Sequence, residues 1–355
     1  MKNILGIKKE NNYYKIHVFD KKFKIFRFFK VLKNINHIKE SLDLNVLRIN
    51  SVSRGNIFFW ENEEKMSYKE KVWYISQRFY ERLGYFPDLV NPKTFNEKLN
   101  WMKLHYNNPL ETRCIDKYEF KDYIKEKLGE GYTAPLLGVW DSVDDIDFEK
   151  LPERFFIKTN NGGGSYHQGV YFVEEKSKTN LEEVKYLLND WLQEWQNVYY
   201  STLASGYKDI KPMIIAEEDI GMWFNKGAWQ YEIFCFHGEI KYILLKKHSP
   251  KRIYPKRFVV DKDFNNLNIR FANYKNDILN EKPTRFDDAV KIAEKLSKDF
   301  PFVRIDINVT NKGLYIGELT FTPAGGYNTY SPVDWDMKIG EWLDLSKLNK
   351  DYIID

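Results

Sequence analysis

A glycine-rich loop between two apolar segments is the feature that most restricts how this chain can fold. The segments FFIK, TNNGGGSYHQG and VYFVE follow one another and predict a strand, a loop and a second strand. Such a loop lets backbone amides fold over phosphates, while the ammonium group of Lys158 at the strand end meets their charge. By itself the pattern also fits a structural hairpin. The predicted phosphate contacts are Lys158, Gly162, Gly163, Gly164 and Ser165.

Two common nucleotide motifs do not describe this loop. No G-K-[ST] follows the glycines, so the loop is not a Walker A motif. The next predicted element is a strand and not a helix, which excludes a dinucleotide-binding fingerprint. If the loop binds phosphates, it must do so in another kind of fold.

A pair of carboxylates near the carboxyl end forms the second pattern. The segments FVRIDINV and GLYIGELTF flank Asn311-Lys312-Gly313 and predict a hairpin. A tight hairpin can bring Asp306 and Glu318 face to face beside Arg304. Paired carboxylates select Mg²⁺, with ATP phosphates completing its coordination shell. The alternative interpretation is a cross-strand charge cluster on the surface.

The segment KPMIIAEEDI supplies a third candidate. Its apolar residues predict a strand that ends at Glu217 and Glu218. Carboxylates at a strand exit can accept hydrogen bonds from an adenine amino group or from ribose hydroxyls. A plain surface turn explains the same residues.

The remaining pattern mixes helices with strands, which predicts an α+β enzyme. Thr94 with Glu97 forms a capping box that opens a helix, and we expect Pro109 to close it. The segments WQYEIFCF and IKYILL predict a second hairpin. Further helices are predicted over residues 64–83, 116–128, 181–194 and 285–300.

Composition narrows the class of protein. The 355 residues allow two or three domains, and the net charge of +4 gives no indication of nucleic-acid binding. The two cysteines, Cys114 and Cys235, fit a reducing cytoplasm and no cysteine zinc site. No run of 18 apolar residues occurs, so we expect a cytoplasmic protein. Residues 1–35 carry nine Lys and one Arg against two acidic residues, which is either a solvated face or a region attracted to an anionic membrane or glycan.

The order of these elements, preceded by CIDKYEFK, resembles the ATP-grasp superfamily. The resemblance implies an α+β ATP-grasp fold that holds ATP and Mg²⁺ between two α+β subdomains, with an extra N-terminal region. It implies phosphate contacts by Lys117 and Lys158, with Arg304 and Lys158 as catalytic residues. It further implies adenosine contacts at Glu217, Glu218, Ile220 and Glu232, and metal ligands at Asp306, Glu318 and Thr320. The corresponding regions are 1–70, 71–154 for the helical first part, 155–220 with the glycine loop, and 221–355 with the carboxylates.

Residues 80–345, from NPKTFNEKLNW to GELTFTPAGGYN, resemble more narrowly the TupA-like branch of the superfamily. This resemblance implies an enzyme of capsule or cell-wall polysaccharide synthesis that joins an amino acid or amine to a carboxylate, for which a uronic acid is the preferred candidate. One departure from many ATP-grasp ligases is Thr320, where they carry an asparagine. The number of bound magnesium ions therefore stays open.

Several alternatives remain at this level. A phosphotransferase can use the same fold, and a binding module would bind ATP without turnover. A glycosyltransferase often carries a D-x-D motif, and such triplets begin at Asp145, Asp261 and Asp334. Acceptor recognition is predicted, with a solvated basic loop as the alternative, for four residues after the segment IKYILLKK. They are His248, Lys251, Arg252 and Arg257.

Overall fold

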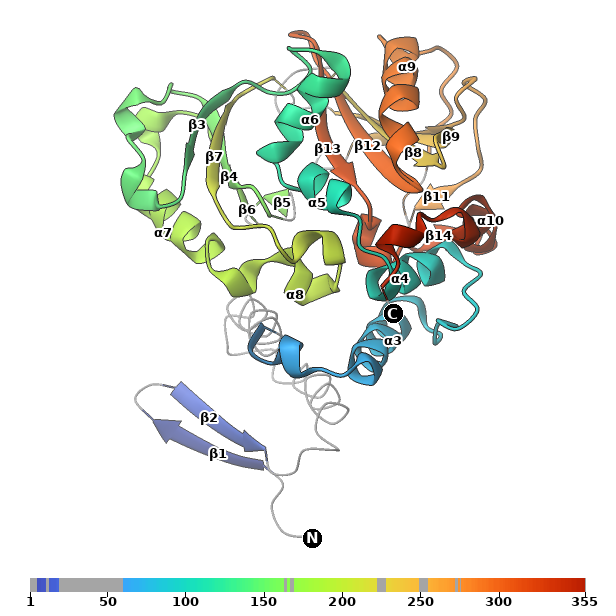
Figure 1. Cartoon of the computed structure of the whole chain (residues 1–355). Coiled ribbons are helices and arrows are strands. Elements are labelled where there is room, and N and C mark those ends of the chain that lie inside the picture. Colours follow the sequence, from blue (N-terminus) through green and yellow to red (C-terminus); the bar gives the residue numbers. More distant parts are fainter. Residues whose placement is uncertain are drawn as a thin grey trace. The chain divides into compact units, whose positions relative to one another are not determined.

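The computed structural model describes residues 5–10, 13–18, 60–162, 165–166, 169–221, 228–248, 255–271, 274 and 276–354. The chain divides into two units, Met1–Arg54 and Gly55–Asp355. In the first unit, β1 (Leu5–Glu10) and β2 (Tyr13–Val18) form an antiparallel hairpin (Figure 1). No helix in the described ranges has the length and apolar character needed to cross a membrane.

The second unit begins with helices whose starts are fixed by their capping residues. These helices are η1 (Glu63–Lys65), α3 (Tyr68–Leu83), α4 (Phe95–His105), α5 (Pro109–Ile115) and α6 (Glu119–Leu128). Ser67 forms a capping box with Glu70, so α3 begins later than its apolar spacing predicts. The capping box of Thr94 and Glu97 that the sequence predicts is confirmed.

The predicted role of Pro109 is wrong. The helix α4 already ends at His105, and Pro109 occupies the first turn of α5 behind the N-cap Asn108. Proline favours this position because its missing N–H would lack an intrahelical partner there, and its fixed φ suits the helix. Pro109 therefore begins the helix α5 and does not end α4.

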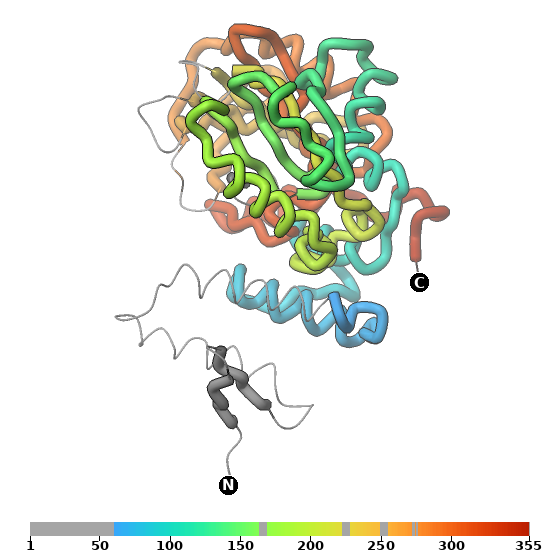
Figure 2. Tube along the Cα trace, turned by 90° about the vertical axis from the view of Figure 1, so that its left-hand side faces the viewer, coloured from blue at the N-terminus to red at the C-terminus, as the bar shows by residue number. Residues whose placement is uncertain are grey.

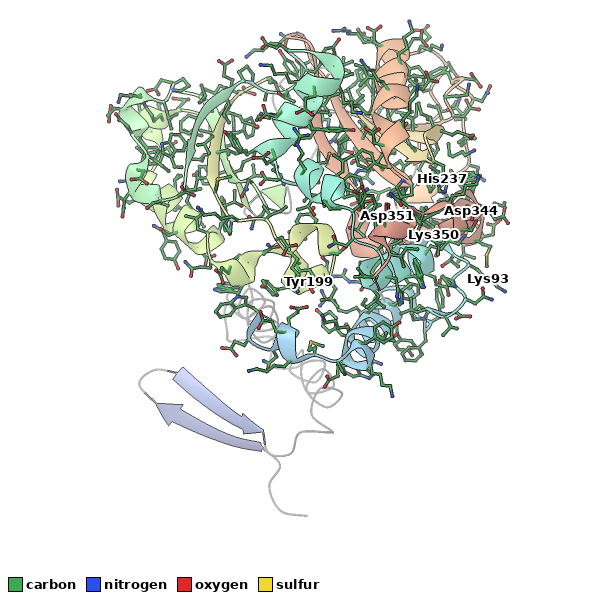
Figure 3. The ribbon with its side chains drawn as sticks, in the orientation of Figure 1. Lys93, Tyr199, His237, Asp344, Lys350 and Asp351 are labelled. Atoms are coloured by element: carbon green, nitrogen blue, oxygen red, sulfur yellow. The ribbon has the colours of Figure 1, made fainter. Side chains whose placement is uncertain are left out.

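Glu63 ties this first helical part to a later helix. Its buried carboxylate accepts hydrogen bonds from Lys71 at 2.6 Å and from the hydroxyl of Tyr199 at 2.6 Å (Tyr199 in Figure 3). It also lies 3.1 Å from the ammonium group of Lys208. Burial alone would raise the pKa of Glu63, but these three partners lower it to about 2. The ionised carboxylate therefore stabilises the packing of η1 and α3 against α8 (Val198–Thr202).

A first β-sheet carries the glycine loop. Its strands are β3 (Leu136–Trp140), β4 (Phe155–Thr159), β5 (Ser165–Tyr166), β6 (Gly169–Val173) and β7 (Ile214–Glu218). Their order is β3-β7-β4-β6-β5, and only β5 pairs in parallel. One face is covered by α7 (Leu181–Trp191), whose Val184 and Leu188 pack on Phe155 and Ile157 of β4. We call this the small sheet. The short helices of this part are η2 (Val143–Asp145), η3 (Phe148–Lys150), η4 (Lys176–Lys178), η5 (Glu194–Gln196) and η6 (Ser205–Tyr207).

A second β-sheet carries the predicted metal carboxylates. Its strands are β8 (Trp229–Phe236), β9 (Glu239–Lys247), β10 (Lys256–Val260), β12 (Phe302–Val309) and β13 (Leu314–Thr320). They are antiparallel in the order β10-β9-β8-β12-β13, and both predicted hairpins are confirmed. One face packs on α6 and α9 (Phe286–Leu296). We call this the large sheet.

The other face of the large sheet is apolar at one end and polar at the other. At the apolar end, Phe236 and Phe302 pack against Phe95 of α4, with ring centroids 5.5 and 4.9 Å from it. The remaining elements of this layer are β11 (Arg270–Phe271), η7 (Ser297–Asp299), η8 (Pro323–Gly326), β14 (Tyr330–Ser331), α10 (Trp335–Trp342), η9 (Leu345–Lys347) and η10 (Lys350–Tyr352). Side chains alternate across a strand, so Arg304 and Asp306 follow Phe302 on this same face.

The two sheets lie side by side, with α5 and α6 between them in the view of Figure 1. Turned by 90°, the green segments of the small sheet stand in front of the orange segments of the large sheet (Figure 2). The loops and the helix N-termini that lie between the sheets are therefore the segments that can connect the polar groups of one sheet with those of the other.

Candidate active site

The small sheet contributes a carboxylate held between two lysines. Glu217 on β7 is buried and lies 2.5 Å from Lys158 of β4 and 2.6 Å from Lys121 of α6. Burial by itself would raise the pKa of Glu217, but the two ammonium groups lower it below its ordinary value. Glu217 is therefore an ionised acceptor that orients both lysines.

The neighbouring predicted residues lie differently. Glu218 follows Glu217 on the strand, so its side chain points to the opposite face, and it is exposed. Ile220, predicted as a backbone contact, lies just beyond the end of β7 and is half-buried. The structure thus brings Glu217 together with the lysines and leaves Glu218 outside this group.

Lys117 joins the start of α6 to the glycine loop. Its buried Nζ donates to the carbonyl of Gly162 at 2.5 Å, and its backbone N–H donates to Asn160 at 3.0 Å. Asn160 in turn donates to Asp116 at 2.9 Å. Burial lowers the pKa of Lys117, and the nearby charge of Glu318 is the first influence that opposes this shift. A lysine so placed lies within electrostatic reach of both sheets.

Only part of the loop can be placed. Gly162 is described, and a Cβ there would come within 2.9 Å of Thr159 Oγ1 and 3.1 Å of the Gly169 Cα, so glycine is required for this close approach. Gly163 and Gly164 lie outside the described residues. Ser165 begins β5, but its side chain is not described.

The large sheet contributes three carboxylates in one row. Asp306 on β12 lies directly opposite Glu318 of β13 and opposite Glu232 of β8. Arg304 binds Asp306 through two parallel hydrogen bonds, Nε to Oδ1 at 2.6 Å and Nη2 to Oδ2 at 2.8 Å. The hairpin therefore places the predicted carboxylate pair face to face beside the predicted arginine.

The charges in this row are not balanced. Burial, with the charges of Glu232 and Glu318, raises the pKa of Asp306 to about 7 in spite of Arg304. The nearby carboxylates raise the pKa of Arg304, although its burial opposes this. Burial would raise the pKa of Glu232, but Arg304 and its ion-pair partner Lys246 lower it. The row therefore favours an additional cation.

The residues present fit a hard divalent cation. Thr320 Oγ1 is buried beside Arg304's strand and has no hydrogen-bond partner in the described part of the chain. Together with Asp306 and Glu318 it offers oxygen donors only, which is the donor set that Mg²⁺ prefers. Among the described residues no group of three or more His, Cys, Asp and Glu side chains could hold a metal by itself. A bound Mg²⁺ would complete its shell here with further oxygen atoms, from water or a ligand.

Electrostatic coupling connects the two halves. The pKa of Lys117 responds to Glu318 of the large sheet and to Lys158 and Glu217 of the small sheet. Desolvation raises the pKa of the half-buried Tyr207, the charge of Glu318 raises it further, and Arg304 opposes the shift. The lysines and the carboxylates therefore belong to one charged region between the sheets.

Three residues of this region were not predicted from the sequence. Lys121 stands four positions after Lys117, so helical spacing could have placed both on one face. Lys246 lies on the predicted hairpin of β8 and β9, but its ion pair with Glu232 depends on the strand register. Tyr207 gave no signal, because Glu318 is distant from it in the sequence.

The residues predicted for acceptor recognition are only partly described. His248 directly follows β9, and Arg257 is the second residue of β10. Lys251 and Arg252 lie outside the described residues. Of the four residues predicted for acceptor recognition, the structure describes His248 and Arg257.

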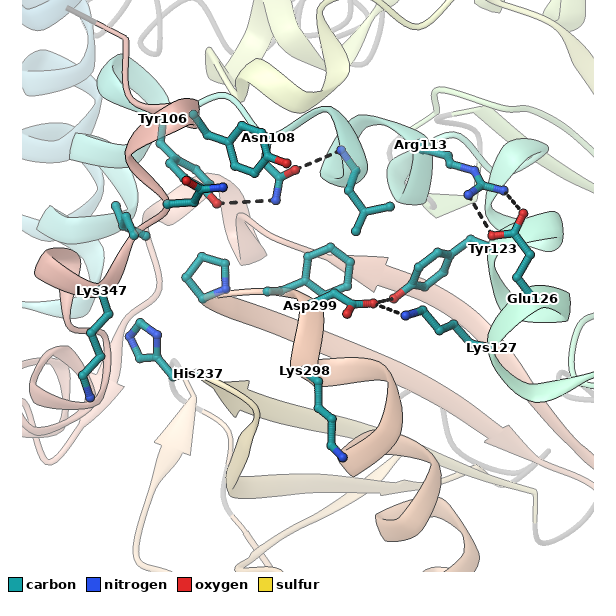
Figure 4. Close-up of a pocket in the computed structure, with 16 residues that line it drawn as sticks. Tyr106, Asn108, Arg113, Tyr123, Glu126, Lys127, His237, Lys298, Asp299 and Lys347 are labelled. Atoms are coloured by element: carbon teal, nitrogen blue, oxygen red, sulfur yellow. Dashed lines mark hydrogen bonds and ion pairs between the residues drawn. The ribbon is translucent and has the colours of Figure 1, made fainter.

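A large cavity of about 660 Å³ lies elsewhere and contains none of the predicted site residues (Figure 4). Its charged walls are largely satisfied within the protein. Arg113 pairs with Glu126 at 2.6 Å, and Lys127 pairs with Asp299 at 2.5 Å. On chemical grounds we place the candidate site between the sheets and not in this cavity.

The D-x-D triplets have local structural roles. Asp147 accepts a hydrogen bond from the backbone of Glu149 at the start of η3. Asp261 accepts from two backbone N–H groups of its own turn, and Asp336 binds Asn96 of α4. These contacts account for the triplets without a nucleotide-sugar site.

Lysines in and beside one sheet, carboxylates on a second sheet and a glycine loop are the features expected of an ATP-grasp enzyme. The sequence matches the TupA-like ATPgrasp family over residues 97–344. Because this match covers most of the chain, the protein belongs to that family. The expected ATP-grasp fold is confirmed, and so is the expectation of an ATP-dependent enzyme of this class.

Solved structures that match the chain include D-alanine–D-alanine ligases. The ligase from Bacillus anthracis complexed with ATP is 15% identical, with a TM-score of 0.36, over 61% of this chain and 58% of the ligase. The Helicobacter pylori enzyme is 15% identical, with a TM-score of 0.38, over 70% and 69% of the two chains. The N5-carboxyaminoimidazole ribonucleotide synthetase from Thermus thermophilus is 12% identical, with a TM-score of 0.30, over 69% and 50%.

The chain thus spans less than two thirds of the Bacillus anthracis ligase. No curated protein matches the sequence.

Proposed function

We propose that this protein is an ATP- and Mg²⁺-dependent carboxylate–amine ligase that acts through an acyl phosphate. The observation that carries the proposal is the row of Arg304, Asp306 and Glu318 within electrostatic reach of Lys117. Cations on one side and carboxylates on the other suit a triphosphate with its metal. An arginine among them suits an acid substrate.

Each residue then has a distinct task. Lys117 and Lys158 contact the phosphates together with the loop amides around Gly162. Asp306, Glu318 and Thr320 hold Mg²⁺, which offsets phosphate charge when bound. Arg304 is fixed by Asp306, so its remaining N–H donors can bind the substrate carboxylate and then the tetrahedral oxyanion.

The adenosine contacts are also part of the proposal. Glu217 and the backbone near Ile220 lie at the end of β7, where an adenine amino group can be bound. Glu232 is placed for ribose hydroxyls, with Lys246 as its partner in the absence of nucleotide.

The reaction transfers the γ-phosphoryl group of ATP to a carboxylate oxygen and releases ADP. An amine then attacks the acyl carbon, phosphate leaves with the electron pair of the single bond between the acyl carbon and the phosphate oxygen, and the amine loses a proton to give the amide. We propose an amino acid or another amine as the nucleophile and a sugar acid, such as a uronic acid, as the carboxylate. The pathway is capsular or cell-wall polysaccharide synthesis, in the cytoplasm and at the inner face of the membrane.

Hydroxylamine trapping tests this reaction. The protein is incubated with ATP, Mg²⁺ and glucuronate, and both ADP and hydroxamate are measured. Acid-dependent ADP release with hydroxamate formation is expected, and Glu318→Gln should abolish both. A stable phosphorylated sugar would instead identify a kinase. Nucleotide binding without ADP release in the presence of any acid would identify a binding module.

A further inference from the structure

A group of cations continues the polar row of the large sheet toward its edge. Arg257 of β10 lies opposite Lys246 of β9, and Lys246 lies opposite Gln230 of β8. Gln230 lies two residues before Glu232 on the same strand, so alternation places its side chain on the face that carries Asp306. The sheet face thus runs from carboxylates at β13 and β12 to cations at β9 and β10.

The cations at this edge exceed the acidic partners available to them. Lys246 is taken by Glu232, with which it forms an ion pair. Arg257 lowers the pKa of Glu232 from a distance but makes no ion pair with any described residue. Its charge is therefore not matched within the described part of the chain.

Two buried nitrogen atoms at the same edge also lack partners. Arg257 Nε and His248 Nε2 have no hydrogen-bond partner among the described residues. The guanidinium of Arg257 lies 3.6 Å from the ring centre of Tyr274, a stacking contact that fixes its plane. Leaving such polar atoms buried and unpaired is unfavourable, and a bound anion would offset that cost.

We propose that Arg257, Lys246 and His248 form an anion subsite for a second acidic group of the substrate. This inference rests on the proposed ligase function and names its substrate class. The acid that reacts at Arg304 carries a further carboxylate or phosphate, which the edge of the large sheet binds. Arg257 thereby selects dianionic sugar acids over simple monocarboxylates.

Binding of three related sugar acids tests the proposal. The full chain, saturated with Mg²⁺ and a non-hydrolysable ATP analogue, is titrated calorimetrically with glucuronate, glucarate and glucuronate 1-phosphate. The last two add one carboxylate or one phosphate. A charge-assisted pair predicts that at least one of them binds about tenfold or more tightly than glucuronate. The tighter of the two identifies the second group.

The variants locate the effect. Arg257→Gln should remove the preference for the dianion and leave glucuronate and nucleotide-analogue binding unchanged. Arg257→Lys should keep part of the preference, because the charge remains without the planar fork. Lys256→Gln is the matched control, since this lysine is exposed on the same strand and should have no effect.

Equal or undetectable binding of the three acids to the native protein would overturn the subsite, as would a preference that survives in Arg257→Gln. Failure of the ligase proposal looks different. In that case the dianion still binds through Arg257, but neither ADP nor hydroxamate is formed.

Discussion

The two sheets treat their buried carboxylates in opposite ways. In the small sheet, Glu217 is shared by Lys158 and Lys121, so cations outnumber the carboxylate and its pKa is lowered. In the large sheet, carboxylates outnumber the nearby arginine, and the pKa of Asp306 is raised to about 7. Under the proposed function, the excess of cations suits the small sheet to an anionic nucleotide, and the excess of carboxylates suits the large sheet to a metal cation.

In the proposed reaction, phosphoryl transfer needs residues of both sheets. A triphosphate brings negative charge that the small sheet can offset, and its metal brings positive charge that the large sheet can offset. The site is therefore stabilised by its ligands, and changes on either side should have different kinetic effects.

Neutralising the carboxylates of the large sheet should give the largest effect. Asp306→Asn and Glu318→Gln should each lower kcat by about 10³-fold or more, because metal and acid substrate lose their positions. ADP release at saturating ATP measures this, over a range of Mg²⁺ concentrations. Glu341→Gln on α10 is the control and should retain activity. Near-native turnover in either variant would remove these residues from the site.

Removing a lysine of the small sheet should act mainly on nucleotide binding. Lys158→Met should raise the KM for ATP by about 10–100-fold, since a charge-assisted phosphate contact is worth roughly 1.5–3 kcal/mol. ATP titrations of ADP release give the value. The exposed Lys211, which pairs with Asp141, provides the control Lys211→Met. An unchanged KM for ATP would mean that Lys158 only serves Glu217.

Glu63 lies outside both sheets, so its replacement should change the stability of the protein without changing the candidate site. Glu63→Gln should lower the free energy of unfolding by about 2 kcal/mol, because the neutral side chain loses its charge-assisted contacts with Lys71, Lys208 and Tyr199. Its folded pKa of about 2 lies below the ordinary value of 4.5, so the native protein has this contribution above pH 4.5 and loses it as the pH falls toward 2. Urea unfolding at pH 7 and at pH 3 measures both effects. The gap between native and variant should shrink at the lower pH, and a constant gap would contradict the assignment.

The smallest change in the KM for ATP is expected for Glu218, one of the two adjacent glutamates of β7. Glu218→Gln should change the KM for ATP by less than about twofold, because its exposed side chain points away from the lysines. Glu217→Gln, its matched partner, should raise this KM more, since Lys158 and Lys121 lose their orienting carboxylate. Reversed effects would show that Glu218, and not Glu217, faces the nucleotide.

Local patterns in the sequence determined much of the fold. The capping box at Thr94 and the two hairpins depend on residues a few positions apart. The exact pairing of Asp306 with Glu318 depends also on a register shift directly after Asp306, which the sequence does not mark. The glycine loop at Gly162 was also predicted from residues that are close together in the sequence. Pro109 was misassigned because proline marks a helix boundary without saying on which side the helix lies.

The tertiary structure alone decided which charges meet. The pairing of β12 with β8 sets Glu232 beside Asp306, and the pairing of β9 with β10 sets Lys246 beside Arg257. The contacts of Lys121 with Glu217 and of Lys117 with the glycine loop arise where α6 packs beside the small sheet. Such contacts depend on sheet register and packing, which no local pattern of side chains encodes.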